Sequence, residues 1–118
     1  MGLLRWFTKN WANTTEPTHP DLSPLAVPLG PADAVELVRA AVHTLPRWAV
    51  VEPTPVGMHL TRSTRLFRFT DDITVSFVQA GNDRTLIHAE SRSRVGKGDL
   101  GQNRRNIREL FRAIRATS

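Results

Sequence analysis

Three glycines near the C-terminus, in the stretch VGKGDLG at positions 95–101, follow the spacing G-x-G-x-x-G. In dinucleotide-binding folds this spacing lets the backbone approach a pyrophosphate between a strand and a helix. Such a fold also requires a second parallel strand, with a carboxylate about twenty residues further on for the ribose. Here the loop is followed only by a predicted helix. We therefore expect a corner between a strand and a helix, with Asp99 capping the helix.

Basic residues surround this predicted corner. Two arginines lie on the strand before it, a lysine lies within it, and another arginine lies on the helix after it. Backbone amides at the start of a helix, together with cationic side chains, can hold an anion. The sequence therefore predicts a candidate anion site. Its residues are Arg92, Arg94, Lys97, Asn103 and Arg104.

Polar residues on two neighbouring predicted strands form a second group. A hairpin turned at 81–83 places residues near 72 opposite residues near 92. This predicts a cross-strand ion pair between Asp72 and Arg92 or Arg94. The alternative is a polar pocket for a small ligand or substrate, although acid–base work by adjacent aspartates is not expected because they point to opposite faces. The residues of this polar constellation are Asp71, Asp72, Ser91, Arg92 and Ser93.

Residue types that commonly carry catalysis are sparse in this sequence. Cysteine is absent, the four histidines lack metal-binding spacing, and no serine lies in a G-x-S-x-G turn. We therefore predict no catalytic residue, no metal site and no cofactor. The lack of cysteine is compatible with a reducing compartment, so we expect a cytoplasmic protein.

Positive charge is concentrated in the last third of the chain. The net charge is +5, yet residues 1–83 hold 7 basic and 8 acidic side chains, whereas residues 84–118 hold 9 basic and 3 acidic ones. Such asymmetry indicates an anionic ligand or an acidic partner, or else a solvated helix face. Sequence-specific nucleic-acid binding is not expected, because a helix-turn-helix partner is missing and the chain has no tyrosine for an aromatic RNA-stacking platform. The arginines in helical register are Arg104, Arg108, Arg112 and Arg115.

The N-terminal residues 1–12, MGLLRWFTKNWA, combine aromatic and basic side chains at helical spacing. They predict a short amphipathic helix, which either docks on the domain or lies in a membrane surface. The second reading would make the protein membrane-peripheral. The sequence makes no prediction of the oligomeric state.

The remaining elements are read from apolar periodicity and from prolines. Residues 1–30 hold the short helix and an extended proline-rich arm, and residues 31–118 form one domain. The fold class predicted is α+β: a helix, a four-stranded antiparallel meander and a second helix, with both helices on one face of the sheet. The odd-numbered residues of the third predicted strand should point inward. The predicted helices begin at 31 and near 100, and the predicted strands are 48–51, 58–69, 73–78 and 85–95.

Four stretches carry a resemblance to a known family. They are LPRWAVV at 45–51, FTDDITV at 69–75, SRSRVGKGDLGQNRRNIR at 91–108, and an N-terminal segment at 10–25. Together they resemble the bacterial and plastid family catalogued as domain of unknown function 1499. The resemblance implies that residues 91–108 and the Asp71–Asp72 pair are a family signature, and it implies no activity. Members often carry serine in place of Gly98, which further weakens the phosphate-loop reading.

From these observations we expect a small non-enzymatic binding or interaction module with a basic C-terminal surface. Its ligand or partner would be anionic. One alternative is an enzyme or small-ligand protein that uses the polar constellation as a pocket. Another is a peripheral membrane protein that binds through residues 1–12.

Overall fold

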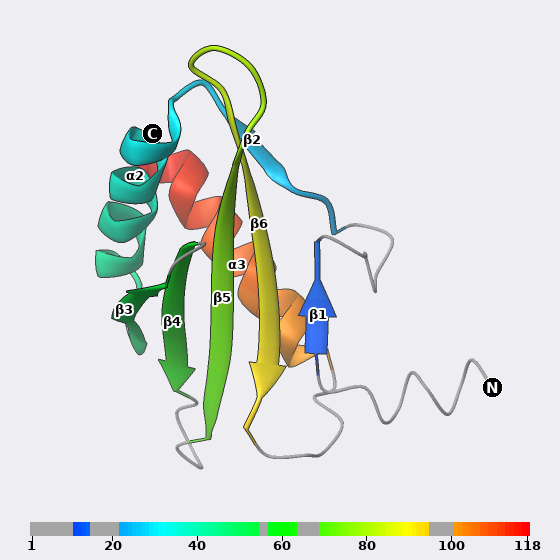
Figure 1. Ribbon diagram of the computed structural model, residues 1–118. Helices are drawn as coiled ribbons and strands as arrows, with labels where there is room; N and C mark the ends of the chain where they lie inside the picture. The colour runs from blue at the N-terminus through cyan, green and yellow to red at the C-terminus, as the bar shows by residue number, and fades with distance from the viewer. Residues whose placement is uncertain (1–10, 15–21, 55–56, 64–68, 95–100) are drawn as a thin grey trace, which may run out of the picture.

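The computed structural model describes residues 11–14, 22–54, 57–63, 69–94 and 101–118. These residues form a six-stranded antiparallel sheet with two helices behind it (Figure 1). The predicted α+β class is therefore confirmed. In chain order the elements are β1 (Trp11–Asn13), β2 (Leu25–Val27), α2 (Pro31–His43), β3 (Trp48–Thr54), β4 (Gly57–Ser63), β5 (Thr70–Gln79), β6 (Thr85–Ser93) and α3 (Gln102–Thr117).

The strands β3 to β6 lie side by side in sequence order, and each pairs antiparallel with the next. Gly57 is required where β4 begins, because a Cβ atom there would lie 1.7 Å from the carbonyl oxygen of Val75. The close approach of β4 to β5 therefore depends on a residue without a side chain. In the next pair, Asp72 is the register partner of Arg92, as the hairpin argument predicted.

The prediction of four strands is wrong, because two further short strands pair with the outer edge of β6. β1 pairs with residues 90–92 and β2 with residues 85–87, so the two strands follow one another along the same edge. Leu25–Val27 lies between Pro24 and Pro28, and these three residues keep the N–H groups that pairing needs. The arm, which the sequence predicts only as extended and proline-rich, therefore also supplies an edge strand.

The segment expected to be a helix over residues 1–12 is a strand where the structure describes it. Residues 1–10 lie outside the described part of the chain, while Trp11–Asn13 forms β1. Ala12 has no solvent exposure, and the Thr14 hydroxyl accepts a hydrogen bond from the Ala89 N–H at 2.9 Å. This part of the N-terminus therefore packs on the sheet.

One face of the sheet is buried beneath α2 and α3 (Figure 1). Ile73 and Val75 of β5 are fully buried, so the predicted inward direction of the odd positions is confirmed for them. Val38 of α2 and Ile107 and Leu110 of α3 complete this core with no exposure. None of the described helices is long and apolar enough to span a membrane.

The start of α3 differs from the prediction. The helix begins at Gln102, and Gly101, not Asp99, occupies the N-cap position, without a side-chain hydrogen bond. Gly101 has φ of 84°, in the left-handed region that glycine adopts most readily. Its carbonyl oxygen accepts the first helical hydrogen bond, from the Arg105 N–H at 3.0 Å. Asp99 itself lies outside the described residues.

Replacing Gly101 tests this corner. Gly101→Ala should lower the free energy of unfolding by about 1–2 kcal/mol, because alanine in the left-handed conformation costs roughly that amount. Gly101→Asn introduces a Cβ at the same place, but asparagine adopts this conformation more readily and should recover part of the loss. Urea denaturation of the three proteins measures the difference. Equal stability of the alanine variant and the natural protein would contradict the assigned geometry.

Candidate functional site

A cluster of polar side chains lies between the sheet and the first half of α3, where a hydrophobic core would be expected. Asp71 is 3% exposed, and Ser91, Asn103 and Asn106 have no exposure, while Ser93 is partly buried. Burial of so many polar atoms is tolerated only when they are hydrogen bonded. We call these five residues, Asp71, Ser91, Ser93, Asn103 and Asn106, the buried polar network.

The hydrogen bonds of this network connect three elements. Asn106 Nδ2 donates to Asp71 Oδ2 at 2.7 Å and to Ser91 Oγ at 3.1 Å. The Ser91 hydroxyl donates to Asn103 Oδ1 at 2.5 Å, and Asn103 Nδ2 donates to Ser93 Oγ at 3.0 Å. Gln102 Nε2 completes the set by donating to Asn106 Oδ1 at 2.7 Å. The start of α3 is therefore tied to β5 and β6 by directional bonds.

The network divides the predicted polar constellation in two. Asp71, Ser91 and Ser93 point toward α3 and bond within the network, whereas Asp72 points to the opposite face of the sheet. The alternation along each strand explains this separation, since neighbouring residues face opposite sides. Asn106 was missed by sequence reasoning, although its spacing of three from Asn103 places both on one helix face.

On the face of the sheet opposite α2 and α3, Asp72 joins two basic side chains. Arg94 donates through Nε to Oδ2 at 2.8 Å and through Nη2 to Oδ1 at 3.0 Å, so the two side chains form a bidentate salt bridge. His59 Nε2 lies 2.8 Å from Oδ1, and because a carboxylate only accepts, this nitrogen carries the donated hydrogen. The Arg94 hydrogen bond is the main reason that the pKa of Asp72 lies below its ordinary value, although partial burial opposes it.

The described residues of the candidate anion site do not come together. Arg94 pairs with Asp72, and Arg92 donates to Glu90 Oε1 at 2.8 Å. Asn103 is buried on the other side of the sheet. Lys97 lies outside the described residues, and Arg104 lies on α3 as predicted. A single anion site built from these side chains is therefore not assembled by the described part of the structure.

The outward side of α3 carries a row of four exposed arginines, which includes Arg108, Arg112 and Arg115 of the predicted row. The four exposed members have the spacing three, four, three, which follows one side of a helix. Arg104 of the predicted row is only partly exposed. Arg105 was missed, although this spacing would have identified it. We call the four exposed residues the arginine face: Arg105, Arg108, Arg112 and Arg115.

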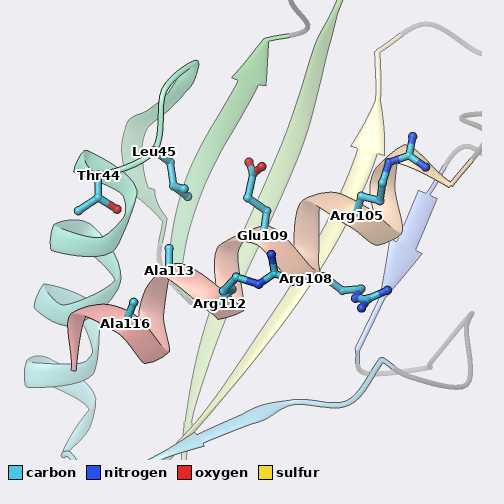
Figure 2. Close-up of a pocket in the computed structure, with 8 residues that line it drawn as sticks. All are labelled: Thr44, Leu45, Arg105, Arg108, Glu109, Arg112, Ala113 and Ala116. Carbon is cyan, nitrogen blue, oxygen red and sulfur yellow. The ribbon is translucent and has the colours of Figure 1, made fainter.

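Two hollows border the arginine face. The first, which we call the α2 groove, has a volume of about 520 Å³ and lies between α3 and the end of α2 (Figure 2). The second is smaller, about 270 Å³, and lies between α3 and Leu22–Ser23 of the N-terminal arm. Arg108 and Arg112 line both hollows. Small-molecule ligands are commonly bound in pockets of several hundred cubic ångströms, so the α2 groove is large enough to hold one.

Glu109 is the one acidic residue among those that line the α2 groove. Its Oε1 accepts hydrogen bonds from Trp48 Nε1 and, at 3.2 Å, from Arg62 Nε. The carboxylate is therefore compensated by partners on β3 and β4, and the lining as a whole favours negatively charged ligands. Within the described ranges, no group of three histidine, aspartate or glutamate side chains is placed to hold a metal ion.

The position of Asp72 predicts how stability depends on pH. A carboxyl whose pKa is lowered on folding adds stability above its unfolded pKa and loses it as pH falls through the folded value. Asp72→Asn should therefore lower the melting temperature at pH 7, and the difference should shrink as pH falls below 3.8, the ordinary aspartate value. Asp83→Asn in the exposed β5–β6 turn is the control. A difference that stays constant down to pH 2 would contradict the ion-pair assignment.

Comparison with known proteins adds a family but no activity. No curated protein matches this sequence. One family model, described as a protein of unknown function (DUF1499), matches residues 7–114. That span includes β1 to β6, α2, the buried polar network and most of α3. With its model covering nearly the whole length, the chain belongs to the DUF1499 family.

Proposed function

We propose that this protein is a small non-enzymatic binding module that holds an anionic ligand or partner on the arginine face. The observation that carries the proposal is the position of Arg108 and Arg112, which line both hollows beside α3. Arg108 and Arg112 are exposed and one helical turn apart, and each guanidinium is a planar group with several donors, which suits phosphate and carboxylate groups. The concentration of positive charge in residues 84–118 supports the same reading.

The geometry of the polar constellation favours a structural role over a substrate pocket. Ser91 and Asn103 have no exposed surface and bond to one another, so neither hydroxyl nor amide is presented to solvent. Asp72 is accessible, but its carboxylate is occupied by Arg94 and His59. These contacts give the enzyme alternative less support than the binding alternative.

Charge reversal on α3 tests the proposal. Pyrophosphate is a suitable probe, because it is small, strongly anionic and free of apolar groups. We expect salt-sensitive binding by the natural protein, and a loss of at least about tenfold in affinity for Arg108→Glu/Arg112→Glu. The matched control, Arg39→Glu/Arg84→Glu, changes net charge equally on α2 and in the β5–β6 turn. Isothermal titration calorimetry at low and high salt measures both.

Two results would overturn the proposal. One is the absence of salt-sensitive pyrophosphate binding by the natural protein. The other is an equal loss of affinity in the two double variants, because attraction by net charge alone would then account for the binding. Circular dichroism of each variant checks that the fold is kept. Arg84, Arg108 and Arg112 are exposed and Arg39 is partly exposed, so these surface positions are expected to tolerate replacement.

A further inference from the structure

The α2 groove is not uniform along its length. Figure 2 shows Thr44, Leu45, Ala113 and Ala116 together at the end nearest α2, with Arg105 at the opposite end. Arg108 and Arg112 lie between them on α3. One end of the groove is therefore apolar and the other is cationic.

The dimensions of the groove follow from the helix that forms its floor. The lining runs from Arg105 to Ala116 on α3, which is about 16 Å along the axis at 1.5 Å per residue. Ala113 and Ala116 have short side chains, so a ligand can approach the helix backbone closely at the apolar end. Leu45 forms the opposite wall there and packs against the core, so this wall is firmly held.

The charged groups of the α2 groove are also unevenly distributed between its sheet side and its solvent side. Glu109 lies in the middle of the lining, and its carboxylate accepts hydrogen bonds from Trp48 and Arg62, which reach it from β3 and β4. Its charge is thus offset from the sheet side, and the exposed Arg105, Arg108 and Arg112 give the solvent side of the groove a net positive charge. An anionic group is favoured beside Arg105 and Arg108. Among the described residues that line the groove, those at the end nearest α2 (Thr44, Leu45, Ala113 and Ala116) are uncharged.

From this polarity we infer that the α2 groove binds a single-chain amphiphile, an organic anion with a phosphate or carboxylate head and a short apolar tail. The head lies against Arg105, Arg108 and Arg112, and the tail lies over Ala113 and Ala116 against Leu45. The inference rests on the proposed anion-binding function, and it adds that the ligand also carries an apolar tail. A purely polar anion would leave the apolar end of the groove unused.

A pair of alkyl phosphates tests the inference. Ethyl phosphate and octyl phosphate carry the same head, and the natural protein should bind octyl phosphate at least about tenfold more tightly, because each fully buried methylene adds up to about fourfold. Octyl glucoside, which has the tail without the charge, should bind more weakly than octyl phosphate. All three are used below the concentration at which they form micelles.

Placement in the groove is measured by methyl NMR and by one variant. The methyl signals of Leu45, Ala113 and Ala116 should move with octyl phosphate and not with ethyl phosphate. Ala116→Trp fills the apolar end at an exposed position, so it should remove most of the gain from the tail. It replaces no arginine, so it should weaken octyl phosphate binding far more than pyrophosphate binding.

The outcomes separate this inference from the proposed function. Equal affinity for the two alkyl phosphates, or undiminished octyl phosphate binding by Ala116→Trp, would overturn the amphiphile inference while pyrophosphate binding still supports the anion site. Binding of octyl glucoside as tight as that of octyl phosphate would also overturn it, because the tail alone would then account for the affinity. If the natural protein bound neither pyrophosphate nor either alkyl phosphate, the proposed function itself would be overturned.

Discussion

The carboxylate of Asp71, buried beneath α3, constrains the rest of this structure. A carboxylate removed from water is stable only if its oxygens receive hydrogen bonds, and Asn106 supplies one at 2.7 Å. Asn106 can do so only while α3 lies at one height and one rotation on the sheet. Hydrophobic contacts tolerate sliding, whereas these bonds do not, and the buried polar network therefore sets the position of the helix.

One side of α3 packs on the sheet and the other faces solvent, and the residue types on the two sides differ accordingly. Asn103 and Asn106 lie on the side that bonds to the sheet, and Arg105 and Arg108 lie on the side exposed to solvent. Because the inner side is locked to β5 and β6, the outer side presents its arginines at fixed places beside the end of α2. The stretch 91–108, which carries the family resemblance, supplies Ser91, Ser93, Asn103 and Asn106 of the buried polar network. It also supplies Arg105 and Arg108 of the arginine face. The glycine-containing corner in this stretch therefore matters because it connects β6 to α3, not because of its glycine spacing.

Sequence reasoning succeeded where the pattern alone decides the outcome. The antiparallel class, the inward direction of Ile73 and Val75, and a pairing of Asp72 with Arg94 follow from alternation and from hairpin register. These features depend on residues that are neighbours in the sequence or across a short turn. They can be counted without knowledge of the tertiary structure.

The failures share a different cause, which is contact between distant segments. β1 and β2 are each three residues long and form because β6 offers an open edge, a fact that their own sequences do not contain. The N-cap position at Gly101 depends on the path of the whole corner, and local capping rules favoured Asp99 instead. The α2 groove joins the end of one helix to a helix about sixty residues later, so no spacing in the sequence indicates it.

Hydrogen exchange of the side-chain amides of Asn103 and Asn106 tests the central claim most directly. NMR resolves these NH₂ groups and compares them with the exposed Asn82. If the network locks α3 to the sheet, both amides should exchange only by global unfolding, at the free energy shown by the slowest backbone amides of β6 and α3. Exchange of Asn103 and Asn106 as fast as that of Asn82 would show that the network opens freely, and it would contradict this account.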